Sequence, residues 1–161
     1  MKRMLDTNAV DEAAWDRVIA TNLKASFFCL KAEAAQMKAQ GNGAILFNGS
    51  ILAEIAQPGT SVYSASKGGV VSLARAAAVE LGPFGIRVNT INAPITRTPM
   101  TQARITKGPD GKETHPLAAN IPLERLAEPE EIARVAMFLL SDLASYVNGQ
   151  AIDVGGSQSV V

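Results

Sequence analysis

Apolar residues recur every three or four positions along the first quarter of the chain, a spacing that places them on one face of an α-helix. Asp11, just before them, suits the N-cap position, and Glu12 is favourable in a first helical turn. Gly41 follows the last of them and is typical of a helix end. The pattern therefore predicts a long helix that ends at about Gln40. Its apolar positions are Trp15, Val18, Ile19, Leu23, Phe27, Leu30 and Met37.

Three shorter apolar runs have the length and composition of buried strands. They are Ala44–Asn48, Ile86–Ile91 and Gln150–Val154. A helix rich in small residues is expected from about Val62 to Gly82, and another should begin at Pro129 and end near Ser141. A long loop should join Ile91 to that last helix. Strands that alternate with helices predict an α/β fold, namely a partial doubly wound parallel sheet of about three strands in a single domain over residues 1–161.

The charge balance excludes some classes of partner. The 161 residues include 15 basic and 15 acidic ones, so the formal net charge is zero and nothing favours nucleic acid or an anionic membrane. Cys29 is the only cysteine, which excludes a disulfide framework. No apolar run approaches the ~20 residues that span a bilayer, and no signal peptide is evident at the amino terminus. We therefore expect a cytoplasmic protein.

Three polar residues stand where the elements of such a sheet would meet. Ser50 follows the first strand, while Tyr63 and Lys67 are four residues apart in the small-residue helix and so share one face of it. Ligands of open α/β sheets bind beyond the carboxyl ends of the strands. A lysine ammonium and a helix start both favour the phenolate of a tyrosine, so we expect the pKa of Tyr63 to be depressed. Together with a serine hydroxyl, such a group can move a proton on and off an oxygen bound to carbon.

The order and spacing of these three residues resemble a pattern found in the short-chain dehydrogenase/reductase family. Ser50, Tyr63 and Lys67 match its catalytic pattern, and nearly the whole chain carries supporting segments. These are Thr21–Lys24, Gly85–Asn89, Pro122–Arg125, Glu128–Ala133, Phe138–Ser141 and Gly149–Gln150. The resemblance implies a Rossmann-like oxidoreductase that transfers hydride between a nicotinamide cofactor and an alcohol or carbonyl substrate. In it, Ser50 would orient the substrate oxygen, Tyr63 would be the acid/base, and Lys67 would lower the pKa of Tyr63 and hold the nicotinamide ribose.

The glycine-rich turn with which this family binds the cofactor pyrophosphate is not found in these residues. No ribose-reading residue that would distinguish NAD from NADP is found either. The chain thus resembles the carboxyl-terminal part of such an enzyme. The alternative to an oxidoreductase is a catalytically silent truncated fragment that keeps the catalytic residues without the cofactor site.

The resemblance also assigns roles to residues that spacing alone leaves open. Asn22 is either a structural asparagine that bonds the backbone of a neighbouring strand or, by resemblance, part of a proton relay through water to Lys67. Thr98 matches a cofactor-contacting threonine, and Thr96 stands at a neighbouring cofactor position where the family has a hydrophobic residue. His115, the only histidine, is expected to be a solvent-exposed loop residue.

Two features predict association between copies of the chain. The family commonly pairs its two long helices across a two-fold axis, so a homo-oligomer is expected. The small residues Ala74, Ala77 and Ala78 would allow close approach of two helices. The first strand, at Ala44–Asn48, should in addition be left as an unpaired sheet edge.

Overall fold

A sheet of three parallel strands organises the computed structural model, which describes residues 6–108, 111, 113–115 and 121–160. The strands are β1 (Gly43–Asn48), β2 (Ile86–Asn92) and β5 (Ala151–Asp153), in the order β1–β2–β5. β1 and β2 run in register from the pair Gly43–Ile86 to the pair Asn48–Ile91. The three predicted strands and the α/β fold class are confirmed.

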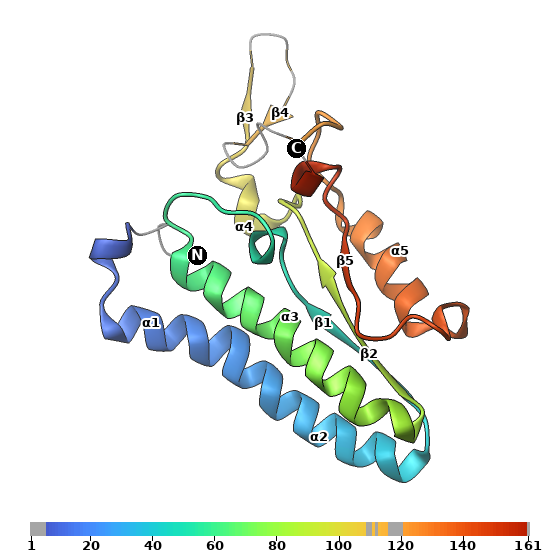
Figure 1. Cartoon of the computed structure of the whole chain (residues 1–161). Helices are drawn as coiled ribbons and strands as arrows, with labels where there is room; N and C mark the ends of the chain where they lie inside the picture. Colours follow the sequence, from blue (N-terminus) through green and yellow to red (C-terminus); the bar gives the residue numbers. More distant parts are fainter. Residues whose placement is uncertain (1–5, 109–110, 112, 116–120, 161) are drawn as a thin grey trace.

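Helices lie on both faces of this sheet (Figure 1). On one face α3 (Ser61–Leu81) packs on β2, with the long rod of α1 and α2 beside it, and α5 (Pro129–Leu140) packs on the other face. A short α-helix, α4 (Pro99–Gln102), follows β2. The predicted helices over 62–82 and 129–141 are therefore confirmed within a residue or two.

The long first helix is not a continuous α-helix. Asp11 caps α1 (Glu12–Ile19), its Oδ1 accepting from the Ala14 N–H at 2.7 Å. A π-helical turn then covers Ala20–Lys24, and α2 runs over Ala25–Gln40. Gly41 ends α2 at a φ of 73°, a left-handed conformation that glycine adopts without strain. The predicted bounds are right, and the π turn inside them was not predicted.

The core lies between α3 and the sheet. Its residues are Leu30, Ile45, Phe47, Val70, Ala74, Ala77, Ala78, Leu81, Ile86 and Val88. Because Ala74, Ala77 and Ala78 are at most 4% exposed within one chain, they do not form a surface for a second copy. The expectation that these alanines mediate self-association is wrong, because their small size instead allows α3 to lie close to the strands.

The segment after β2 is more ordered than the expected long loop. Besides α4 it contains a short antiparallel pair of strands, β3 (Thr106–Lys107) and β4 (Glu113–Thr114). This hairpin stands apart from the main sheet, above its carboxyl end (Figure 1). Its strands are two residues long, too short to leave a clear alternating pattern in the sequence.

The outer side of β1 has no neighbouring strand among the described residues, where β1 pairs only with β2. The expectation of an unpaired first strand is confirmed. In the same described part of the chain, no helix is long and apolar enough to cross a membrane.

Candidate active site

Ser50, Tyr63 and Lys67 gather at the carboxyl end of β1. The Lys67 ammonium donates to the backbone carbonyl of Asn48, the last residue of the strand, at 2.7 Å. It lies 5.8 Å from the centroid of the Tyr63 ring, within the range of a cation–π contact. Ser50 is hydrogen-bonded to the Tyr63 side chain. The fold thus brings together the three residues that sequence spacing singled out.

The protonation of Tyr63 differs from the expectation. Burial raises the pKa of Tyr63 above 10.0, and the hydrogen bond with Ser50, which lowers this pKa, does not outweigh it. Burial also lowers the pKa of Lys67. The expected depression of the Tyr63 pKa is therefore wrong for this state, because desolvation of the phenolate exceeds the favourable contacts. Tyr63 therefore keeps its proton at neutral pH.

The backbone around Ser50 is fixed by local and distant contacts. The Ser50 hydroxyl accepts from the Leu52 N–H at 3.2 Å, which closes a short turn after β1. The Ser50 N–H donates to the Asn92 side-chain Oδ1, also at 3.2 Å. Ser50 is 7% exposed, so its hydroxyl is presented from a buried position.

Asn22 lies inside the π-helical turn and contacts α3. Its Nδ2 donates to the Ser66 hydroxyl at 3.0 Å, and that hydroxyl donates to the Tyr63 carbonyl at 2.7 Å. Asn22 is therefore linked through Ser66 to the helical turn that carries Tyr63. The structure joins it to the site, with a partner on α3 rather than the strand backbone that the structural alternative assumed.

Thr96 and Thr98 follow the carboxyl end of β2. The Thr96 hydroxyl donates to the Pro94 carbonyl at 3.1 Å. Thr98 caps α4 in a reciprocal arrangement with Thr101, whose hydroxyl accepts from the Thr98 N–H at 3.0 Å. Both side chains are half-buried at the carboxyl end of the sheet, where ligands of such folds bind.

The prediction for His115 is wrong. The side chain is 1% exposed, and burial together with the nearby Arg104 lowers its pKa below 6.5. The polar residues around it in the sequence predicted a solvated loop, but His115 directly follows β4 and is buried.

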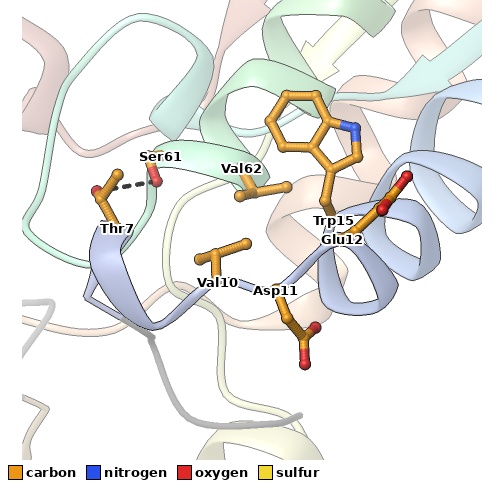
Figure 2. A pocket seen from close by; sticks show the side chains of 7 residues that line it. All are labelled: Thr7, Val10, Asp11, Glu12, Trp15, Ser61 and Val62. Carbon is orange, nitrogen blue, oxygen red and sulfur yellow. Dashed lines mark hydrogen bonds between the residues drawn. The ribbon is translucent and has the colours of Figure 1, made fainter.

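A separate hollow of about 320 Å³ lies between the segment before α1 and the start of α3 (Figure 2). Val10 and Val62 point toward one another across it, and the Trp15 ring lies above. Thr7 and Ser61 close one side through a hydroxyl contact of 3.3 Å. Its lining does not include Ser50, Tyr63 or Lys67, so it is a different place from the polar cluster.

Two contributors to the site were not found from the sequence. Asn92 and Ser66 carry no pattern of their own, and their contacts depend on segments 42 and 44 positions away along the chain. Among the described residues, no group of His, Cys, Asp and Glu could hold a metal ion. The hydroxyl and ammonium groups of the cluster can transfer protons and form hydrogen bonds.

Comparison with known proteins places the chain in a family. A family model described as Enoyl-(Acyl carrier protein) reductase matches residues 1–157. The chain is 38% identical over 148 residues to the (3R)-3-hydroxyacyl-CoA dehydrogenase of Mus musculus, covering 91% of this chain and 55% of that protein. It is 41% identical over 152 residues to the cis-4-hydroxycyclohexanecarboxylate dehydrogenase of Sinomonas cyclohexanicum, covering 94% of this chain and 59% of that protein.

Solved structures agree with this placement. A gluconate 5-dehydrogenase from Burkholderia cenocepacia, in complex with NADP and tartrate, superimposes with a TM-score of 0.90 at 26% identity. The match covers 100% of this chain and 62% of that one. The chain thus spans little more than half the length of these relatives. From the family match and these likenesses, the chain belongs to the short-chain dehydrogenase/reductase family.

Proposed function

We propose that this chain supplies the proton-transfer and substrate-orienting residues of an oxidoreductase that interconverts an alcohol and a carbonyl compound. The observation that carries the proposal is the contact between Ser50 and Tyr63, with Lys67 beside them, at the carboxyl end of β1. The two curated relatives are both dehydrogenases named for hydroxyl-bearing compounds, which supports a small-molecule alcohol as the substrate class.

Each residue has a distinct role in the proposal. Ser50 orients the substrate oxygen by a hydrogen bond, and Tyr63 donates its proton to that oxygen during carbonyl reduction. Because burial holds Tyr63 protonated, reduction proceeds from the state described here. Oxidation of an alcohol needs the phenolate, so its rate should increase with pH as Tyr63 loses its proton. Asn22 orders the relay that returns a proton towards Lys67.

NAD or NADP is the proposed hydride carrier. Hydroxyl and ammonium donors suit a ribose and a carboxamide. Such donors lie at the carboxyl end of the sheet, on Tyr63, Lys67, Thr96 and Thr98. They fit the nicotinamide end of the cofactor. When bound, the cofactor supplies or accepts the hydride, while the residues of this chain hold the oxygen and move the proton.

Tyr63→Phe tests the role of the phenol in a protein that joins this chain to a cofactor-binding half. Turnover should be abolished, because the hydroxyl that donates the proton is removed. Tyr146→Phe is the matched control, since Tyr146 is the other tyrosine of the chain and is fully exposed. If Tyr63→Phe keeps most of the turnover, the acid/base assignment is wrong.

The 161 residues alone are expected to show no measurable dehydrogenase activity. A pyrophosphate site needs the backbone amides of a glycine-rich turn, and these residues do not contain one. Calorimetry with NADH and NADPH, followed by assays over a panel of alcohols and ketones, would measure this. Steady turnover by the purified chain would contradict it.

We also propose that the chain forms a homo-oligomer in the cytoplasm and binds neither nucleic acid nor membranes. Since the alanines of α3 are internal, the surface offered for association is the outer face of α2, where Phe27 and Phe28 are 48% and 54% exposed. Sedimentation of the chain and of Phe28→Ser measures this. A dimer or tetramer weakened by the substitution supports the proposal, and a monomer at micromolar concentration contradicts it.

A further inference from the structure

One buried side chain connects the ends of all three strands of the sheet. Asn92, the last residue of β2, is 0% exposed. Its Oδ1 accepts from the Ser50 N–H just after β1, at 3.2 Å, and its Nδ2 donates to Oδ1 of Asp153, the last residue of β5, at 2.8 Å. Both ends of the carboxamide are therefore bonded, which fixes its orientation.

The Ser50 N–H is bonded to a side chain, whereas its neighbours are bonded to the backbone. The N–H groups on either side of Ser50 donate to backbone carbonyls, that of Gly49 to Ile91 at 2.9 Å and that of Ile51 to Ala93 at 3.2 Å. The Ser50 N–H is instead satisfied by the Asn92 side chain. An unsatisfied buried N–H is costly, so the carboxamide keeps this stretch of backbone in place.

The glycine beside Ser50 makes room for this contact. A Cβ at position 49 would lie 2.2 Å from the Asn92 Oδ1 and 2.6 Å from the Thr90 Cγ2, distances that real Cβ atoms do not show. Gly49 and Asn92 are thus sterically complementary. A larger residue at either place would displace the other, which indicates that the two positions work as a pair.

We propose that Asn92 is a positioning residue that fixes Ser50 so that its hydroxyl meets Tyr63, with Asp153 anchoring the carboxamide from β5. This inference rests on the proposed function, in which Ser50 orients the substrate oxygen. Without the carboxamide, the Ser50 N–H loses its partner and this peptide group can reorient, so that the hydroxyl keeps the local bond to the Leu52 N–H in preference to the contact with Tyr63.

The chain allows a direct readout, because Tyr63 and Tyr146 are its only tyrosines. Both are replaced by 3-fluorotyrosine, whose phenol is more acidic, and each is titrated by fluorine NMR in the full chain. The contact with Ser50 lowers the pKa of Tyr63, so losing it should raise that pKa by about half a unit to one unit. Asn92→Ala and Ser50→Ala should both produce this rise, with the Lys67 ammonium left in place.

Asn89→Ala is the matched control. Asn89 is also a buried asparagine of β2, at 1% exposure, but its carboxamide bonds the Val147 carbonyl and the Gln150 N–H. It should destabilise the chain without moving the Tyr63 pKa. If Asn89→Ala raises the pKa as much as Asn92→Ala does, general loosening explains the result and the positioning role is refuted.

The remaining outcomes separate this inference from the proposed function. If Ser50→Ala raises the Tyr63 pKa and Asn92→Ala does not, the positioning role is wrong while the contact between Ser50 and Tyr63 stands. If neither substitution raises it, the contact itself fails, and the proposed function loses its main support together with the inference.

A second pair of variants covers the case in which Asn92→Ala does not fold. Asn92→Asp keeps the shape of the side chain but places a second carboxylate next to that of Asp153. The repulsion between the two should displace the side chain from the Ser50 N–H. Adding Asp153→Asn restores a donor and an acceptor with the net charge unchanged, and should return the Tyr63 pKa to its original value. Failure of the second substitution to restore it would overturn the proposal.

Discussion

The two long helices on the same face of the sheet, α2 and α3, differ sharply in how much of each is buried. In α3, eight of 21 residues are buried, including Ser66 and Lys67, whereas Leu30 is the one buried residue among the 16 of α2. α3 lies against β2 and beside the rod of α1 and α2, and α2 also contacts β1 (Figure 1). Small residues therefore indicate a helix that packs closely against its neighbours, and exposed aromatic ones a surface.

The rod also contains a π-helical turn. A π turn contains one residue more than an α turn. The side-chain faces of α2 are therefore rotated relative to those of α1, compared with a continuous α-helix. Phe27 belongs to the apolar spacing that begins at Trp15, and the two side chains are 48% and 45% exposed. The helix that carries Asn22 into contact with Ser66 is thus also the one that turns aromatic side chains outward.

The strongest test of the comparison is a charge in the middle of α3. Ala77→Glu should lower the free energy of unfolding by at least about 3 kcal/mol, because it places an unpaired carboxylate at a position that is 4% exposed. Ala76→Glu, at the exposed neighbouring position, should change it by less than about 0.5 kcal/mol. Urea unfolding measures both. If Ala77→Glu leaves stability unchanged and alters only the oligomeric state, α3 is an association surface after all.

On α2 the corresponding contrast lies between Leu30 and Phe28. Leu30→Ala removes a side chain that is 7% exposed and should cost about 2–5 kcal/mol. Phe28→Ala, although it deletes more atoms, should cost less than about 0.5 kcal/mol in the monomer. Thermal unfolding at low protein concentration compares them. Equal losses would mean that Phe28 is covered within one chain.

Two adjacent glycines of α3 test how closely this helix packs against the rod of α1 and α2. An added Cβ meets nothing within 4 Å at Gly68, but at Gly69 it would lie 2.8 Å from a terminal methyl of Leu23. Gly68→Ala should therefore stabilise the helix by about 0.5–1 kcal/mol. Gly69→Ala should gain less, because the Leu23 side chain must move. An equal gain from both would show that α3 does not press against the rod at this point.

The smallest effect is expected on the opposite face of the sheet, at the exposed start of α5. Hydrogen bonds from Arg125, at 2.7 Å, and from the Glu128 N–H lower the pKa of Glu131 from 4.5 to about 2. The folded chain thus holds this proton less tightly than the unfolded one. The contribution to stability is present above pH 4.5 and is lost as the pH falls toward 2. Glu131→Gln should flatten this part of the pH–stability profile, which urea midpoints between pH 6 and pH 2 would show; an unchanged slope would contradict it.

The elements of the fold were predictable because each repeats a local pattern. The strand at Ala44–Asn48 and the helix that begins at Pro129 follow from apolar runs and cap residues within a few positions. The grouping of Ser50 with Tyr63 and Lys67 was also predictable, since strand ends and helix starts meet at one edge of a parallel sheet.

Features that depend on distant packing were not predictable in the same way. The direction of the Tyr63 pKa shift depends on how deeply the folded chain buries the phenol, which spacing does not report. His115 is buried although the residues around it in the sequence are polar, so its burial depends on how the chain folds around it. Asn92 bonds a residue 42 positions earlier and another 61 positions later, so no local pattern indicates it.

Because one side of β1 is open, the apparent stability of this fold depends on the concentration of any chain that pairs with it. Its backbone N–H and carbonyl groups face outward without a strand partner among the described residues. Any chain that adds a strand there binds the folded state and not the unfolded one, so it raises the apparent free energy of unfolding in proportion to the logarithm of its concentration. A melting temperature measured for this chain is therefore defined only together with the protein concentration and the identity of what occupies that edge.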